Sequence, residues 1–94
     1  MSKNDPSTLS RIAELGCCVC RKIGYPGTPA EFHIFSIKQS KNSTKRVEVV
    51  LPVCPPHHRG ETGIHGLGKR RFEKFYGFTI VELLEDTNNL LEES

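Results

Sequence analysis

The segment Leu51-Pro52-Val53-Cys54-Pro55-Pro56-His57-His58-Arg59-Gly60 carries an apolar run into a Cys-x-x-His pair. A second pair with the same spacing lies upstream, in Cys17-Cys18-Val19-Cys20. A two-residue spacer lets both side chains of a tight knuckle reach one tetrahedral ion. The two pairs therefore predict a structural zinc ion with the ligands Cys17, Cys20, Cys54 and His57.

The residues next to these ligands bear on which cysteines and histidines bind the zinc ion. Cys18 would leave only one residue before Cys20, so we expect Cys18 in the core. His57 and His58 are adjacent, so one can face the zinc ion while the other points to a second environment. The spacing leaves open which of the two does so. The alternative to a zinc site is a set of free buried thiols.

Length and composition set the class of the protein. The chain has 94 residues, of which 36% are hydrophobic, and this fits one domain over 1–94 with a limited apolar core. A structural zinc ion supplies on the order of 10 kcal/mol of apparent binding free energy, which offsets that limit. The sequence has no apolar run that could span a membrane and no secretory signal. We therefore expect a cytoplasmic protein.

The charges are distributed unevenly along the chain. Residues 1–74 carry all 13 Lys and Arg with 6 acidic residues, whereas residues 75–94 carry 5 acidic residues and no Lys or Arg. A basic body suits a polyanion such as nucleic acid. A charged run can equally be a solvated face, so other features must decide between the two.

Periodicity and turn residues predict an α+β order of elements. We expect a helix near 7–15 ended by Gly16, a strand over 30–35, an exposed loop over 38–46, a strand over 47–53, a helix over 69–76 ended by Gly77, and a terminal helix over 80–92. The two strands form a hairpin that returns Cys54 toward Cys17 and Cys20. The domain core is expected over 15–78 and an acidic C-terminal helix over 79–92.

The acidic tail carries a leucine stripe. Thr79 and Glu82 form a capping box at its start. Apolar residues then lie broadly along one side of the helix, at Ile80, Leu83, Leu84, Leu90 and Leu91. The stripe either packs into the core or docks a partner or a second copy of the chain.

Several short sequence motifs follow one another in a characteristic order and spacing. They are Cys17-Cys18-Val19-Cys20-Arg21, Gly24-Tyr25, Pro29-Ala30-Glu31-Phe32-His33, Leu51 to Gly60, Ile64-His65, Phe72-Glu73 and Tyr76-Gly77. Over about 15–87 the chain resembles the HNH endonucleases, and more closely the phage recombination enhancement function (Ref) group of RecA-dependent nucleases. The resemblance implies a small zinc-stabilised ββα-metal domain, of class α+β, with an N-terminal helix and C-terminal helices. It also implies hydrolysis of DNA phosphodiesters.

The resemblance implies two metal sites. The structural zinc set is the one given above, and a separate nuclease metal (Mg²⁺, Mn²⁺ or Zn²⁺) is held by His33 and His58, with His65 as a third candidate. In the family, a second histidine follows on the strand as general base, and here Ile34 stands at that position. Loss of a general base typically removes ~10²–10⁴ of rate. A gapped alignment instead makes His33 the base and leaves a metal ligand missing.

The resemblance and the charge pattern both indicate DNA as the partner. Candidate phosphate contacts are Lys38, Lys41, Lys45, Arg46, Arg59, Lys69, Arg70, Arg71 and Lys74. The resemblance adds recombination intermediates and RecA as partners, in a bacterial cell. Two alternatives stand beside the nuclease: a zinc-stabilised DNA-binding module that has lost hydrolysis through Ile34, and a protein-interaction module that uses the leucine stripe.

Overall fold

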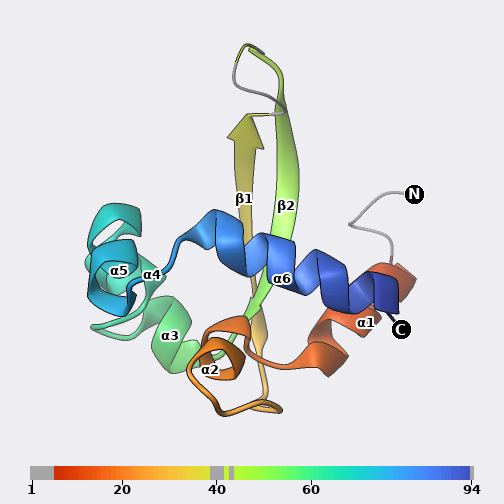
Figure 1. Ribbon diagram of the computed structural model, residues 1–94, viewed down its shortest axis with the longest axis horizontal. Coiled ribbons are helices and arrows are strands. Elements are labelled where there is room, and N and C mark those ends of the chain that lie inside the picture. Colours follow the sequence, from red (N-terminus) through yellow and green to blue (C-terminus); the bar gives the residue numbers. More distant parts are fainter. Residues whose placement is uncertain (1–5, 39–41, 43, 94) are drawn as a thin grey trace.

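A computed structural model of the chain describes residues 6–38, 42 and 44–93 (Figure 1). The described elements are α1 (Pro6–Leu15), α2 (Cys18–Lys22), β1 (Glu31–Lys38), β2 (Arg46–Val53), α3 (Pro55–Arg59), α4 (Ile64–Leu67), α5 (Lys69–Tyr76) and α6 (Ile80–Glu93). The two strands form one antiparallel sheet, and the helices pack around one half of it. The protein is therefore a small α+β protein, as the sequence predicts.

The hairpin is longer than the sequence pattern predicts. β1 and β2 pair without a break up to Lys38 opposite Arg46. The exposed loop expected over 38–46 thus loses both of its ends to the strands, because apolar residues continue to alternate beyond the expected end of β1. The candidate DNA contact Lys41 lies outside the described residues.

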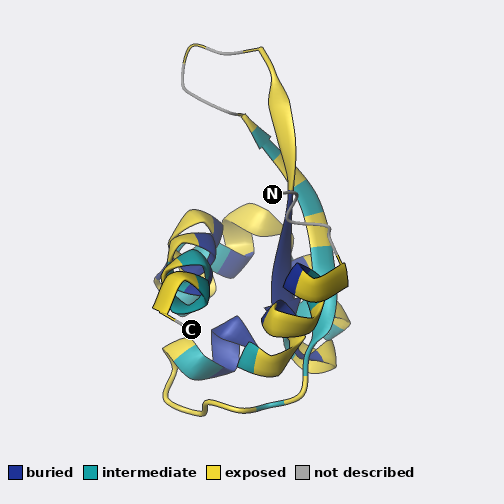
Figure 2. Cartoon of the chain, turned by 90° about the vertical axis from the view of Figure 1, so that its right-hand side faces the viewer, coloured by how far each residue is buried: buried dark blue, intermediate teal, exposed yellow. Residues whose placement is uncertain are grey.

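The two halves of the hairpin have different surroundings. In β2, Val49 to Val53 are buried, whereas Arg46, Val47 and Glu48 are exposed. Figure 2 shows the same division, with the buried half between helices and the other half extending away from them. The buried half anchors the sheet in the core and places the end of β2 next to α2.

The core lies between β2, α5 and α6. Leu51, Phe72 and Leu83 are each 0% exposed. Burial of such a side chain contributes about 1.5–3 kcal/mol. Ile80 and Leu84 of α6 are buried as well, so this part of the leucine stripe packs into the core. These residues of the stripe therefore pack within the chain and do not form an exposed docking surface.

Two polar contacts fix the start of α6. α5 ends at Tyr76 and is capped by Gly77, as predicted, with a φ of +83° that favours glycine. The backbone N–H of Glu82 donates to Oγ1 of Thr79 at 3.0 Å, which confirms this half of the capping box. Glu73 provides a second acceptor, because its carboxylate Oε2 accepts from the N–H of Ile80 at 2.8 Å. This contact also ties α5 to α6.

The sequence pattern does not predict α2, α3 or α4. Each has only 4 or 5 residues, too few for a helical period to show. α3 opens with Pro55 and Pro56, which suit the first turn of a helix because that turn needs no N–H donor. None of the described helices is long and apolar enough to cross a membrane.

Candidate metal centres

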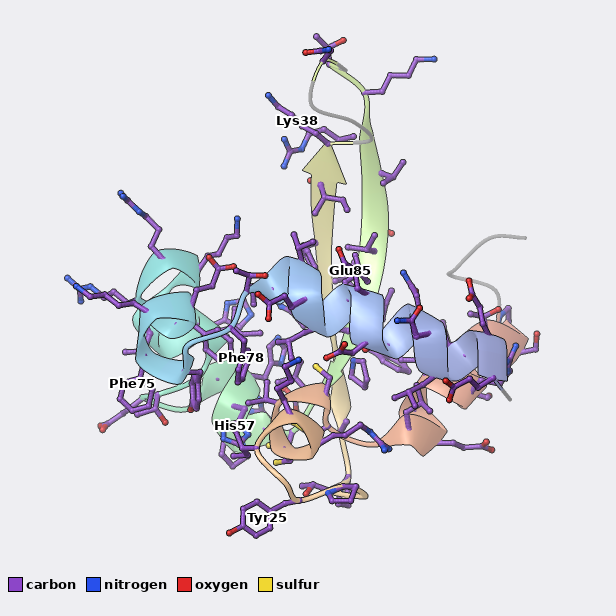
Figure 3. The ribbon with its side chains drawn as sticks, in the orientation of Figure 1. Tyr25, Lys38, His57, Phe75, Phe78 and Glu85 are labelled. Atoms are coloured by element: carbon purple, nitrogen blue, oxygen red, sulfur yellow. The ribbon has the colours of Figure 1, made fainter. Side chains whose placement is uncertain are left out.

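The fold brings the two predicted zinc half-sites together. Cys17 and Cys20 lie at the start of α2, while Cys54 and His57 lie at the start of α3. The backbone N–H of Cys20 donates to Sγ of Cys17 at 3.3 Å, which bends the first pair into a knuckle. Figure 3 shows His57 beside α2, well away from Lys38 on the hairpin. We call these four residues the Cys₃His cluster.

The ligand atoms of the Cys₃His cluster all lie within 4.8 Å of one another. Nδ1 of His57 lies 3.1 Å from Sγ of Cys54, 3.4 Å from Sγ of Cys20 and 3.9 Å from Sγ of Cys17. The Sγ atoms of Cys20 and Cys54 are 3.7 Å apart. Zn–S bonds of about 2.3 Å and Zn–N bonds of about 2.0 Å would place such atoms about 3.5–3.8 Å apart. The cluster could therefore hold a metal ion such as zinc.

The four cysteines are free thiols with two kinds of surroundings. Cys18 stays outside the Cys₃His cluster and packs in the core, as predicted. Burial raises the pKa of Cys18 to about 12, so this thiol stays protonated near neutral pH. Burial likewise raises the pKa of Cys54 to about 12. A metal ion that binds Cys54 must therefore displace its proton.

α3 divides the adjacent histidines between two sites. The ring of His57 faces the thiols and meets the ring of Tyr76 edge-on, with centroids 5.7 Å apart. Consecutive helical residues lie about 100° apart around the axis. His58 accordingly turns away from the thiols and toward His33 and His65. The geometry of α3 thus decides that His57, and not His58, faces the thiols, which the spacing leaves open.

His33 of β1, His58 of α3 and His65 of α4 form a second group, the three-His cluster. Nε2 of His58 lies 3.2 Å from Nδ1 of His33 and 3.0 Å from Nε2 of His65. Tetrahedral Zn–N bonds of about 2.0–2.1 Å would place two such nitrogens about 3.3 Å apart. Three protein ligands leave a fourth position for water or substrate. The cluster therefore has the donors and the spacing for a divalent ion with an open position.

Glu31 holds His58 in the tautomer that metal binding needs. Side chains alternate between the faces of a strand, so Glu31 and His33 lie on the same face of β1. Nδ1 of His58 donates to Oε2 of Glu31 at 2.5 Å, which leaves the lone pair of Nε2 for an ion. A carboxylate behind a histidine ligand is a common feature of metal sites. Sequence reasoning did not assign this role to Glu31, because the pair is separated by 27 residues.

The charges around the three-His cluster suit a cation. Burial and the neighbouring imidazoles lower the pKa of His33 to about 4, so this ring is neutral near pH 7. Hydrogen bonds from Arg59 and His58 lower the pKa of Glu31 to about 2, so its carboxylate stays charged. Arg59 donates to both carboxylate oxygens, from Nε at 2.9 Å and from Nη2 at 3.0 Å. The proposed phosphate contact Arg59 thus pairs with Glu31 in this structure.

Close glycine contacts bring α4 back against α3. A Cβ at Gly66, next to His65, would clash with the carbonyl oxygen of Gly60. A Cβ at Gly63 would lie 2.6 Å from the carbonyl oxygen of His57. Both positions therefore require glycine. The glycine-rich passage after α3 is what places His65 in the three-His cluster.

Ile34 lies outside the three-His cluster. It follows His33 on β1 and so occupies the opposite face, where it is 57% exposed. His33 belongs to the cluster, whereas its neighbour Ile34 does not. Isoleucine at that position offers no group that accepts a proton.

Three candidate DNA contacts gather along a groove that begins at the three-His cluster. Lys38, Arg46 and Lys69 belong to its lining. Arg46 is fixed across the hairpin, since it donates from Nε to Oγ of Ser36 at 3.1 Å and from Nη2 to the carbonyl oxygen of Ser36 at 2.9 Å. The other described candidates are exposed outside this lining: Lys45, Arg59, Arg70, Arg71 and Lys74.

Comparison of the chain with protein-family models, with curated proteins and with solved structures gives no match. The two clusters and the groove are therefore the features from which a function is inferred.

Proposed function

We propose that the protein is a metal-dependent endonuclease of the HNH type, which hydrolyses DNA phosphodiesters at the three-His cluster. The observation that carries the proposal is the convergence of three imidazoles with the Glu31 carboxylate behind one of them. Sites with three protein ligands and an open position typically hold catalytic ions, whereas a full set such as Cys₃His typically holds a structural ion. The resemblance to the HNH endonucleases supports the same assignment.

Each residue around the three-His cluster has a defined task in this proposal. The three histidines hold the ion, Glu31 orients His58, and Arg59 keeps the Glu31 carboxylate in place. A bound divalent ion would polarise a phosphate oxygen and stabilise the departing oxygen. Arg46 and Lys69 attract the phosphates of the substrate to the same side of the molecule.

Position 34 sets the expected rate of the reaction. In the proposed alignment Ile34 replaces the general base, so the attacking water loses its proton without help from this residue. General-base catalysis contributes roughly 10²–10⁴-fold. We therefore expect slow cleavage by the natural chain, and the Ile34→His variant tests whether a histidine on the opposite face of β1 supplies the base.

A second candidate function is a zinc-stabilised DNA-binding module without hydrolysis. The exposed Ile34 favours this candidate, because it removes the base while the basic groove remains. Both candidates predict DNA binding, and only the first predicts cleavage by the natural chain.

From the resemblance to the RecA-dependent nucleases we also propose recombination intermediates as substrates and RecA as a partner protein.

Nicking of supercoiled plasmid and of D-loop DNA tests both candidates. The zinc-loaded protein is assayed in Mg²⁺ or Mn²⁺, with and without RecA, beside His58→Ala and Ile34→His. Glu85→Gln, on an exposed position of α6, is the control. The nuclease proposal predicts cleavage that His58→Ala abolishes and Glu85→Gln preserves. Cleavage by Ile34→His alone would support the binding module, and cleavage by His58→Ala at the natural rate would contradict the proposed site.

A further inference from the structure

The groove at the three-His cluster is large enough to hold part of a substrate. Its volume is about 830 Å³, within the range of ~300–1,000 Å³ that is usual for ligand clefts. β1, α4, α5 and the first turn of α6 form its walls. His33 and His65 belong both to the groove and to the cluster. A molecule that lies in the groove therefore reaches the proposed ion.

The groove has an apolar wall next to the histidines. Phe35 and Ile37 share the face of β1 that carries His33, and Ile80 and Val81 approach from α6. The rings of His33 and Phe35 are stacked, with centroids 5.0 Å apart and planes 22° apart. Val81 is 46% exposed although it is apolar. Such a wall contributes nothing to the binding of phosphates, but it suits the flat faces of nucleic-acid bases.

The same groove carries positive charge. Lys38, Arg46 and Lys69 line it, and the described lining residues include no carboxylate. The contacts to Ser36 hold the Arg46 guanidinium in place before any ligand binds. Three cations without an acid complement a chain of phosphates, whereas an apolar peptide would leave them unpaired.

We infer that the groove receives a single DNA strand whose bases are unpaired. This inference rests on the nuclease function proposed above and names the form of its substrate. An unpaired strand can place its bases against the apolar wall and its phosphates on the cations at the same time. In a duplex the base faces are stacked on one another, so a duplex gains the phosphate contacts alone. The preferred substrate is thus a single-stranded region of DNA.

Binding is measured separately from cleavage. The probes are fluorescein-labelled oligothymidylate and a labelled duplex of the same length, with zinc-loaded protein and no added Mg²⁺ or Mn²⁺. Fluorescence anisotropy at matched salt gives the two dissociation constants. The inference predicts tighter binding of oligothymidylate than of the duplex.

Two matched pairs of variants test the wall and the cations. Val81→Asn alters an exposed valine in the groove, and Val47→Asn alters an exposed valine outside its lining. Lys69→Gln and Lys74→Gln form the corresponding pair on α5. Val81→Asn should weaken oligothymidylate binding several-fold and leave duplex binding unchanged. Lys69→Gln should weaken the binding of both probes more than Lys74→Gln does.

The outcomes separate this inference from the proposed function. Equal affinity for both probes, or equal effects of Val81→Asn and Val47→Asn, would overturn the groove inference even if the protein cuts DNA. Selective binding of oligothymidylate that depends on Val81 would support it even if no cleavage is found. The variant His58→Ala should abolish cleavage and retain the selective binding.

Discussion

Oε2 of Glu31 and Nδ1 of His58 lie 2.5 Å apart, on the side of the His58 ring that faces away from the other two histidines. This contact fixes both the orientation and the tautomer of a proposed metal ligand. The paired Arg59 keeps the carboxylate charged, and the pKa of Glu31 falls to about 2. The order of contacts runs from Arg59 through Glu31 to His58 and ends at the other two histidines of the three-His cluster.

Replacing Glu31 by Gln should weaken metal binding at the three-His cluster. The amide lacks the negative charge of the carboxylate. It therefore binds the Nδ1–H of His58 less strongly and makes Nε2 a weaker metal ligand. Loss of such a partner typically costs about 10–100-fold in metal affinity or activity. Titration of Mn²⁺ or Zn²⁺ into zinc-loaded protein measures the change, with Glu85→Gln as control. An unchanged affinity would show that Glu31 does not support the site.

Replacing Cys54 by Ala should abolish the folded state. A structural zinc ion contributes about 10–16 kcal/mol of apparent binding free energy, which matches or exceeds the total stability of about 5–15 kcal/mol of a typical domain. Circular dichroism and zinc content measure the loss. Cys18→Ala, the buried cysteine outside the cluster, is the matched control and should keep both the zinc ion and the fold. A folded, zinc-free Cys54→Ala protein would contradict the structural role.

Cys18 should resist alkylation across the ordinary pH range. Its pKa is raised from 9.0 to about 12 by burial, so the reactive thiolate does not accumulate between pH 7 and about pH 10. Mass spectrometry after treatment of the zinc-loaded protein with N-ethylmaleimide should find no adduct at Cys18 at pH 7 or at pH 9. Denaturation with a chelator should expose all 4 cysteines to the reagent. A rise in labelling of the native protein over this interval would contradict the burial of Cys18.

Replacing Gly66 by Ala should damage the three-His cluster and spare the Cys₃His cluster. The added Cβ would clash with the carbonyl oxygen of Gly60, so α4 must move and carry His65 with it. We expect the second metal affinity to fall by about tenfold or more, as for the loss of a supporting contact. The zinc content of the Cys₃His cluster serves as the internal control. Full affinity at both clusters would show that α4 can shift without cost.

The Cys₃His cluster could be predicted because its signal is local. Each pair of ligands lies within one turn of chain, and the hairpin between them follows from the short strand segment over 30–35 and the β-branched run over 47–53. The exclusion of Cys18 likewise follows from spacing, and its burial agrees. Local spacing also predicts that His57 and His58 face different surroundings, but only the orientation of α3 decides which one meets the thiols.

The support around the three-His cluster could not be predicted in the same way. Glu31 meets Arg59 across 28 residues, and no periodic pattern connects them. The close approach of Gly66 to Gly60 depends on how two helices of 4 and 5 residues pack, and such helices are too short to be recognised by period. Contacts of this kind join residues far apart in the sequence, so only the folded structure reveals them.

The most direct test of the account counts metal ions per chain. Two separate sites, divided between His57 and His58, predict two equivalents of Zn²⁺ in native mass spectrometry of the natural chain. His58→Ala should retain one equivalent and the fold, whereas His57→Ala should lose the structural ion and unfold. A natural chain that binds one equivalent at saturating Zn²⁺, or a His58→Ala variant that still binds two, would contradict the division of the two histidines between two metal centres.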